Sequence, residues 1–316
     1  MKIEFFARSL LTLILLISLS ACQEEGEPTE IPDEASTALY DAIQSELKAE
    51  TLNQEGKYAK ALALTDQFLA QHGKSADPNV QAEIAKAMQQ KGVALMGLNH
   101  TDKAIQAYDA LLKRFDDAKL IELQEQVAMA MINKAYSFYD LKNSADETKA
   151  YDAVISRFAS SKDSRLLEQV AVAQNNKGYS QILQAKQAWG DVNARNMLLN
   201  QALSAIELAV KAQSRDTRTM ALGNMAYTKW LLGRTDEAKS PLKEALKLGG
   251  EWLYNGEIED TKKFTVPVDV GFIALLNKAW EESQPKVKLK KDQKEGDTTN
   301  ENNSNDENND GSLIHV

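Results

Sequence analysis

The sequence predicts an all-α protein, a solenoid in which helical hairpins stack on one another. One phrase recurs at a constant step of 43 residues: residues 127–137 match residues 170–180 and, less closely, residues 84–94. A second phrase keeps the same step, since residues 108–115 match residues 151–158. A fixed period of this size is typical of stacked helical units, each of which buries its apolar face on the next.

The length and composition suffice for one elongated helical domain, and the chain as a whole is acidic. The 316 residues are 43% hydrophobic and 26% charged, with a formal net charge of −9. An acidic chain repels phosphate backbones, so we expect no nucleic acid partner. Cys22 is the only cysteine, so an internal disulfide is impossible and the core must hold the fold.

The N-terminus has the pattern of an export signal. Lys2 and Arg8 precede an apolar run over residues 10–19, which is too short to span a bilayer as a helix. The run ends in Leu-Ser-Ala-Cys at residues 19–22. This stretch resembles a bacterial lipoprotein signal peptide with its lipobox; an ordinary secretory leader with an incidental cysteine is the alternative.

The lipoprotein resemblance implies where the mature chain begins and where it resides. Residues 1–21 would be the signal peptide, and Cys22 would carry acyl chains such as palmitate that attach the protein to a membrane. Gln23, rather than Asp, after the cysteine implies the outer membrane, with the protein facing the periplasm. The inner membrane and the cell surface are the other locations.

Two segments outside the repeats are too polar to fold by themselves. Residues 22–35 form an acidic tether, with five Glu, one Asp and two Pro between residues 23 and 34. Residues 285–316 begin with lysines and continue with Asn, Asp and Glu, which predicts a disordered tail. Its lysine cluster is a solvated tail or, alternatively, a contact for anionic lipid or glycan.

Between these segments the sequence predicts five hairpins, covering residues 36–73, 78–115, 119–158, 163–213 and 216–248. The extra residues of the 43-residue step fall in residues 116–126 and 160–169, which predicts first helices that are longer at their starts. In the fourth hairpin we expect an insertion over residues 187–196 before a helix at residues 202–212.

The turn sequences resemble those of tetratricopeptide (TPR) repeats. The phrase Glu-Gly-Lys-Tyr-Ala-Lys-Ala-Leu at residues 55–62 carries the resemblance, as do residues 99–104 and 233–238. The family places small residues 12 apart where two helices cross, as Gly92 and Ala104 are here. Glu147 stands where the third hairpin should have a small residue, which predicts a shifted or looser second helix.

The resemblance covers residues 36–249 and implies a right-handed α-solenoid of about five TPR-like hairpins. Residues 249–250 are both glycine and end the fifth hairpin. Residues 251–267 have no clear period, whereas residues 270–280 have the pattern of a short amphipathic helix. Because a terminal repeat needs a cover for its apolar face, residues 250–284 are interpreted as a C-terminal cap.

The TPR resemblance implies that first helices line an inner groove. Its groove positions would form a row of aromatic rings beside a row of amides: Tyr136, Tyr139, Tyr179, Tyr227 and Trp230 with Asn133, Asn176 and Asn224. Such groups suit the binding of a peptide segment. The alternative is that they pack between neighbouring first helices. Lys91, Lys134 and Lys177 recur beside the apolar stripe, where we expect buried stems and solvated amines.

Residue patterns that would indicate catalysis are missing from the sequence. His72, His100 and His315 do not have the spacing of a zinc site. There is also no Gly-rich phosphate loop or nucleophile elbow. We therefore expect neither an enzyme nor a bound metal or cofactor.

The sequence as a whole predicts a lipid-anchored periplasmic scaffold for protein–protein interaction in cell-envelope assembly. Its partner would be a segment of another envelope protein, held in the inner groove. One alternative is an envelope glycan or small-ligand binding protein that stacks its ligand on the aromatic row. A second is a hydrolase, which requires carboxylates that converge in the groove.

Overall fold

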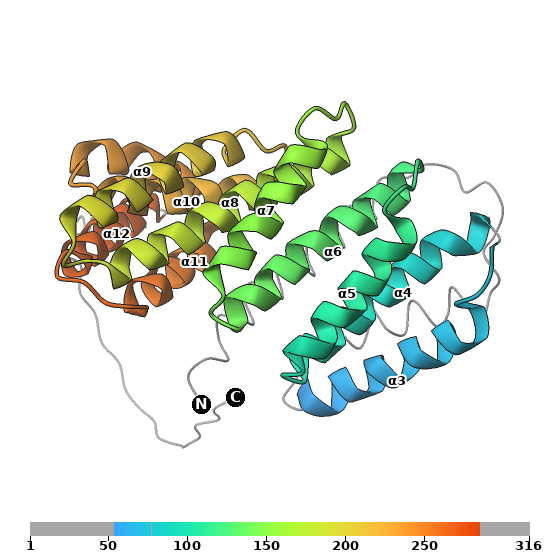
Figure 1. The fold of residues 1–316 in the computed structure, drawn as a ribbon. Coiled ribbons are helices and arrows are strands. Elements are labelled where there is room, and N and C mark those ends of the chain that lie inside the picture. Colours follow the sequence, from blue (N-terminus) through green and yellow to red (C-terminus); the bar gives the residue numbers. More distant parts are fainter. Residues whose placement is uncertain (1–53, 77, 285–316) are drawn as a thin grey trace, which may run out of the picture. The chain divides into compact units, whose positions relative to one another are not determined.

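The structure, a computed structural model, describes residues 54–76 and 78–284, and every regular element in this part of the chain is a helix (Figure 1). The predicted signal peptide, Cys22, the acidic tether, the first helix of the first hairpin and the tail lie outside the described residues. The described helices are α3 (Gln54–His72), α4 (Pro78–Gly97), α5 (Thr101–Phe115), α6 (Ile121–Asp140), α7 (Ser144–Phe158), α8 (Ser164–Gln187), α9 (Val192–Ala209), α10 (Arg215–Leu231), α11 (Thr235–Lys262) and α12 (Asp269–Ser283).

Each helix packs against the next one along the chain, as Figure 1 shows. The first helices of successive hairpins, α4, α6, α8 and α10, also contact one another in that order. This arrangement confirms the predicted solenoid, because each hairpin covers the apolar face of its neighbour. The wall made by these four helices is called the inner face below.

Equivalent residues end the first helix of three hairpins. Asn99, Lys142 and Gly233 have left-handed backbones, with φ of 58°, 57° and 77°. A left-handed residue just after a helix turns the chain so that following amides can donate to the last backbone carbonyls of that helix. Here the amides of His100, Asn143 and Arg234 donate to carbonyls of α4, α6 and α10, respectively. The turn between the paired helices is therefore repeated with the sequence period.

Small residues allow the paired helices to approach, as the repeat pattern predicted. A Cβ atom on Gly92 would lie 2.2 Å from the ring of Tyr108, which is fully buried in α5. A Cβ atom on Gly178 would lie 2.5 Å from Ile206 of α9. Tyr108 recurs 43 residues later as the buried Tyr151, so the same ring fills successive hairpins.

In the second, third and fourth hairpins the first helix is longer than the second, which confirms the predicted extension at the starts of first helices. Helices α6 and α8 have 20 and 24 residues, whereas α5 and α7 have 15 each. The predicted insertion over residues 187–196 was wrong, because α9 already begins at Val192. The Asp191 side chain accepts hydrogen bonds from the amides of Asn193 and Ala194, each at 3.0 Å, and so starts the helix early.

The C-terminal part of the fold contains a helix that the sequence pattern did not predict. Helix α11 breaks at Gly250, whose φ is 59°, and then continues through residues 251–262. Glycine takes this backbone without the strain that a Cβ atom would add. Helix α12 confirms the expected helix over residues 270–280. Residues 250–283 are called the C-terminal segment below.

An ion pair repeats with the period of the sequence. Lys91 pairs with Asp66 at 2.6 Å, Lys134 with Asp109 at 2.5 Å, and Lys177 with Asp152 at 2.5 Å. Each pair joins a first helix to the second helix of the preceding hairpin. The lysine stems are half-buried, as expected, and the structure adds an aspartate counter-ion for each amine. Partly exposed ion pairs contribute about 0–1 kcal/mol to folding stability. Their main effect is therefore on the alignment of each first helix with the preceding second helix.

Candidate functional site

The predicted groove residues lie on three consecutive first helices of the inner face. Helix α6 carries Asn133, Tyr136 and Tyr139; α8 carries Asn176 and Tyr179; α10 carries Asn224, Tyr227 and Trp230. Because these helices contact one another in order, equivalent positions are neighbours. The structure describes the contacts of each residue, whereas its role in binding a partner stays a prediction.

The three amides are buried between first helices. Asn224 donates to Asn175 at 3.0 Å, and Asn175 donates to Asn176 at 3.3 Å. The amide atoms of Asn133, a residue that is only 3% exposed, have no hydrogen-bond partner among the described residues. Burial raises the pKa of the Tyr108 phenol, and the neighbouring Asn133 amide opposes that rise. The bond between Asn224 and Asn175 joins α10 to α8 and so connects two adjacent hairpins.

The aromatic side chains of α10 are covered by the chain itself. The Tyr227 ring lies 4.7 Å from that of Phe272, and its exposed fraction is 1%. The Trp230 indole donates to the carbonyl of Val268 at 2.8 Å. On α6, the buried Tyr136 stacks on the partly exposed Tyr139, with ring centres 5.8 Å apart. The C-terminal segment therefore occupies the α10 part of the predicted groove.

The same segment engages Tyr179 on α8. The Tyr179 hydroxyl donates to Asp260 at 2.9 Å and accepts from the Lys263 amine at 3.0 Å. The amine also lies 5.4 Å from the centre of the Tyr179 ring, within reach of a cation–π interaction. The last turn of α11 and the residue directly after it thus contact the inner face.

A buried lysine completes this contact. The Lys186 side chain of α8 is 0% exposed and pairs with Asp269 at 3.3 Å. Its amine donates to the Tyr227 hydroxyl at 2.6 Å and to the backbone carbonyls of Asp260 and Thr261 at 3.3 and 3.4 Å. The Tyr227 hydroxyl donates in turn to Asp269 at 2.6 Å. Every donor on the lysine amine is used, so its charge is compensated where water is excluded.

These contacts form one cluster, called the polar network below: Tyr179, Lys186, Tyr227, Asp260, Lys263 and Asp269, with the buried Glu257 one helical turn before Asp260. Burial disfavours charge on its members. It raises the pKa of Glu257 and of Asp260, the latter against the opposing charge of Lys263. Burial also lowers the pKa of Lys263, with Asp260 opposing.

A hydrolase would require carboxylates that converge in the groove, and the polar network shows how the carboxylates on the inner face are arranged. Carboxylates do converge on the inner face, but the C-terminal segment supplies them, and Asp260 and Asp269 bond to tyrosines of α8 and α10. Glu257 and Asp269 are only 4% and 1% exposed. A cluster engaged in this way fastens the segment to the first helices.

Reasoning from the sequence missed the polar network because it looked for apolar residues at helical spacing. Leu253, Glu257 and Asp260 follow one another at intervals of four and three, which is a helix face. Two of the three are acidic, so residues 251–262 lack an apolar stripe. Lys186 is similar, because it stands four residues after the buried Ile182 on α8. A charged residue at helical spacing from apolar residues was the pattern that could have predicted the polar network.

Glu147 does not loosen its helix, so that prediction was wrong. It is 2% exposed in the first turn of α7, a regular 15-residue helix, and accepts a hydrogen bond from Ser180 of α8 at 2.9 Å. The Asn143 side chain caps the same turn. Burial raises the pKa of Glu147 to about 7, with the Ser180 hydroxyl opposing.

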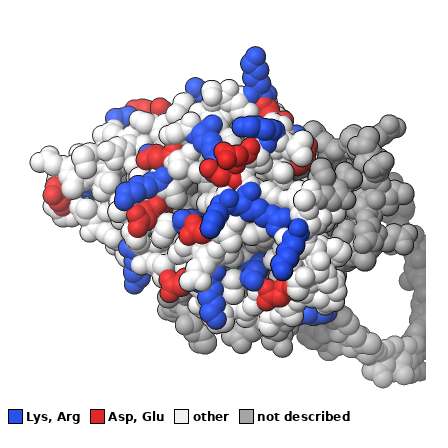
Figure 2. All heavy atoms as spheres, turned by 45° about the vertical axis from the view of Figure 1, so that its right-hand side comes forward, with Lys and Arg blue, Asp and Glu red and all other residues white. Residues whose placement is uncertain are grey.

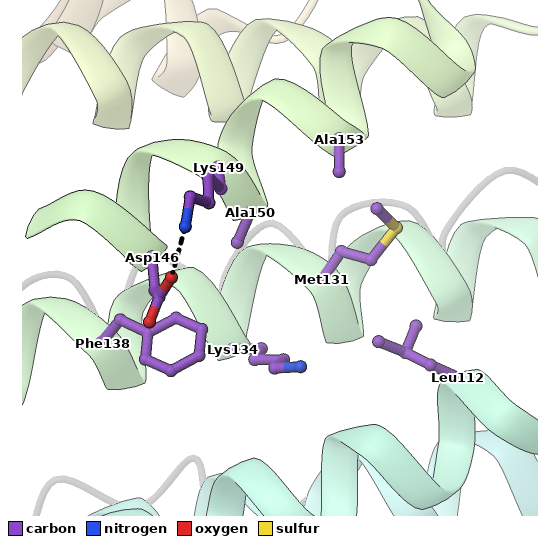
Figure 3. Close-up of a pocket in the computed structure, with 8 residues that line it drawn as sticks. All are labelled: Leu112, Met131, Lys134, Phe138, Asp146, Lys149, Ala150 and Ala153. Atoms are coloured by element: carbon purple, nitrogen blue, oxygen red, sulfur yellow. Dashed lines mark hydrogen bonds and ion pairs between the residues drawn. The ribbon is translucent and has the colours of Figure 1, made fainter. Parts of the chain in front are cut away.

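The structure also contains an open groove between second helices, which the sequence did not predict. Helices α5 and α7 form its walls and α6 its floor, enclosing about 480 Å³ (Figure 3). Figure 3 shows Met131, Lys134 and Phe138 along the floor, with Asp146 and Lys149 joined by an ion pair of 3.1 Å. Its lining residues are Leu112, Met131, Lys134, Phe138, Asp146, Lys149, Ala150 and Ala153.

A second groove of about 440 Å³ lies one hairpin earlier, between α3 and α5 over α4. Its lining residues are Leu62, Asp66, Leu69, Met88, Lys91, Leu95, Lys103, Gln106, Ala107 and Ala110. The two are called the outer grooves below. On the face shown in Figure 2, basic side chains lie interspersed with acidic ones.

Among residues 54–76 and 78–284, no group of three or more His, Cys, Asp and Glu side chains has an arrangement that could hold a metal ion. Within the same ranges, no helix combines the length and apolar character needed to cross a membrane.

Comparison with known proteins finds no matching family model and no matching curated protein. Solved structures do match. MamA of strain RS-1 (the ArsTM double mutant) has 15% identity and a TM-score of 0.40, covering 68% of this chain and 95% of its own. BtubC from P. vanneervenii has 18% identity and a TM-score of 0.44, covering 67% and 89%. A TPR repeats protein from Bacteroides fragilis NCTC 9343 has 14% identity and a TM-score of 0.30, covering 78% and 97%.

Proposed function

We propose that the protein is a non-enzymatic scaffold that binds another protein of the cell envelope on its inner face. The observation that supports this proposal is that the inner face already holds a helical segment of its own chain. Tyr179, Tyr227 and Trp230 make hydrogen bonds to that segment. A face that binds one helix through tyrosine hydroxyls and an indole has the chemistry to bind another.

The part of the inner face on α6 is the proposed site for the partner. Tyr136 and Tyr139 continue the aromatic row beyond the residues that contact the C-terminal segment. Burial raises the pKa of Tyr139 to about 12, with the charges of Glu147, Asp260 and Asp140 adding to the rise, so its hydroxyl stays a hydrogen-bond donor at neutral pH. Tyr136 is only 6% exposed, so an incoming segment would meet the partly exposed Tyr139 ring that stacks on it.

The anchor is the second part of the proposal. The lipobox at residues 19–22 supports a mature protein that begins at Cys22 and is held by acyl chains in the outer membrane, facing the periplasm. The scaffold would then act close to the membrane surface, tethered through residues 22–35. Envelope assembly is the process that such a position serves.

A photoreactive amino acid at Tyr139 tests the binding face in intact cells. We expect it to crosslink to one defined protein, because the side chain lies on the proposed site. The matched control is the same substitution at Ser204, which is exposed on α9. Failure to capture a protein at Tyr139, or capture of the same proteins at both positions, contradicts inner-face binding.

Metabolic labelling tests the anchor. Labelled palmitate is expected on the wild-type protein and not on the Cys22→Ala variant, which should also leave the membrane fraction. Label that persists on the variant, or that never reaches the wild type, rules out lipidation at Cys22. This result is independent of the crosslinking result, so the two parts of the proposal stand or fall separately.

A further inference from the structure

We propose that the partner protein places a lysine or arginine side chain against Tyr136 and Asp140 of α6. This inference rests on the proposed binding of a partner at α6 and adds the chemistry of the group that is bound there. It comes from a set of contacts that two later hairpins complete and α6 does not. The set consists of a tyrosine, an aspartate and a lysine amine, and it is called the triad below.

The first triad joins α8 to the C-terminal segment. The Tyr179 hydroxyl donates to Asp260 at 2.9 Å and accepts from the Lys263 amine at 3.0 Å. The same amine lies 3.8 Å from the Asp260 carboxylate and 5.4 Å from the centre of the tyrosine ring. One amine is thus close to the hydroxyl, the carboxylate and the ring.

The second triad repeats these contacts on α10. Tyr227, which is equivalent to Tyr179, donates to Asp269 at 2.6 Å and accepts from the Lys186 amine at 2.6 Å. This amine lies 3.3 Å from the Asp269 carboxylate and 5.1 Å from the ring centre. Lys186 belongs to α8, whereas Lys263 follows α11, so the two amines come from different elements. The tyrosine position on the first helix is what the two triads share.

Tyr136 stands at the same position on α6, where the triad lacks its amine. It precedes Tyr179 by the 43-residue period, and Asp140 lies one helical turn after it. Tyr136 is only 6% exposed, yet its hydroxyl has no hydrogen-bond partner among the described residues. Burial raises the pKa of this phenol and the Asp140 charge adds to the rise, so the carboxylate acts on the hydroxyl. A tyrosine hydroxyl beside a carboxylate is the arrangement that Lys186 and Lys263 complete elsewhere.

No basic side chain in the described part of the chain completes this triad. Asp140 is exposed and accepts a hydrogen bond from the Thr101 hydroxyl at 2.8 Å, but it forms no ion pair with a described residue. Tyr139 is partly exposed, and the charges that add to the effect of burial on its pKa are those of Glu147, Asp260 and Asp140. All three groups are carboxylates. A cation that arrives from outside would therefore meet a carboxylate without a counter-ion.

These charges favour a basic segment over an acidic or apolar one. An amine or guanidinium could donate to the Tyr136 hydroxyl and to Asp140 while its stem lies on the Tyr139 ring. A carboxylate would be repelled by Asp140, and an apolar side chain would leave both polar groups without a partner. The formal charge of −9 also attracts a basic segment from a distance. We therefore expect the partner to present lysine or arginine to α6.

Binding of synthetic peptides to the full-length protein in nanodiscs of phosphatidylcholine tests the proposal, because this lipid carries no net charge. One peptide contains lysines among alanines and leucines, the second has the same sequence with every lysine acetylated, and the third has glutamates instead. Acetylation removes the charge of each lysine and keeps its stem. Fluorescence anisotropy should show that the lysine peptide binds at least about tenfold more tightly than the other two.

Single substitutions locate the binding. Tyr136→Phe removes only a hydroxyl that has no described hydrogen-bond partner, and Asp140→Asn keeps an acceptor for Thr101 while it removes the charge. Each should weaken binding of the lysine peptide several-fold, with the helical circular dichroism spectrum unchanged. The matched controls Tyr254→Phe and Asp236→Asn, both in α11, should leave the affinity as it is. Asp140→Lys should reverse the preference, so that the glutamate peptide binds more tightly than the lysine peptide.

Three outcomes contradict a basic partner at this position. The first is equal affinity of the lysine and acetylated peptides, and the second is an affinity that Tyr136→Phe and Asp140→Asn leave unchanged. The third is a gain in affinity when the lysines of residues 286–294 are replaced by glutamine, which assigns the position to the chain's own tail. Capture of a protein at Tyr139 in cells, together with equal peptide affinities, overturns this inference and leaves inner-face binding intact.

Discussion

Replacing Lys186 with methionine should lower the free energy of unfolding by about 3–5 kcal/mol, since it leaves a buried carboxylate without its partner. Asp269 is 1% exposed and pairs with the lysine amine at 3.3 Å. Methionine has a similar length, so packing in α8 is kept while the charge and its donors are removed. The Tyr227 hydroxyl and the Thr261 carbonyl lose a hydrogen bond in the same step.

Urea unfolding of the wild type and the variant, followed by circular dichroism, measures this loss. Lys239→Met is the matched control, because Lys239 forms an exposed pair with Asp236 and should cost less than about 1 kcal/mol. The double variant Lys186→Met with Asp269→Asn should recover part of the loss, since the unpaired charge is gone. A Lys186→Met cost as small as that of the control contradicts the role assigned to the polar network.

Replacing Glu147 with glutamine should stabilise the protein at pH 8 by about 3 kcal/mol and leave it unchanged at pH 4. Burial raises the pKa of this carboxyl from 4.5 to about 7 in the folded chain. Between those values the folded state binds the proton more tightly than the unfolded state, so stability is greatest below about pH 4.5 and falls as the pH rises to about 7. Each pKa unit corresponds to about 1.4 kcal/mol.

Unfolding free energies at pH 4, 6 and 8 check this expectation. Glutamine keeps the shape and the hydrogen bond to Ser180 but cannot ionise, so the difference between variant and wild type should grow with pH. Glu251→Gln, at an exposed position of α11, should show no such growth. A constant difference across the three pH values means that Glu147 is not held protonated between α7 and α8.

The architecture could be predicted from the sequence because it depends on features that repeat. The 43-residue step, the small residues at Gly92 and Gly178, and the buried Tyr108 and Tyr151 recur in successive hairpins. A feature repeated at equivalent positions is detectable in one chain without relatives. The longer first helices followed from the same period, whereas the helix over residues 270–280 followed from its own amphipathic spacing.

The C-terminal contact with the inner face could not be predicted because it occurs once and is polar. Lys186, Glu257 and Asp260 have no counterparts in other hairpins, and their charges hide the helix face that they form. The outer grooves could not be predicted from the sequence for a different reason. Their apolar floors have the same composition as packed core, and whether alanines on neighbouring helices leave a space depends on the distance between helices.

The ion pairs between hairpins have a consequence for how such a gene can grow. Lys134 and Asp152 both belong to residues 121–163, a stretch of one full period. If those codons were duplicated, the new lysine would follow the preceding copy's Asp152 at the separation of 25 residues found in each existing pair. Each contact between neighbouring hairpins would therefore have its lysine–aspartate ion pair as soon as the duplication occurred. Duplication of a whole repeat therefore needs no compensating mutation for these ion pairs between hairpins.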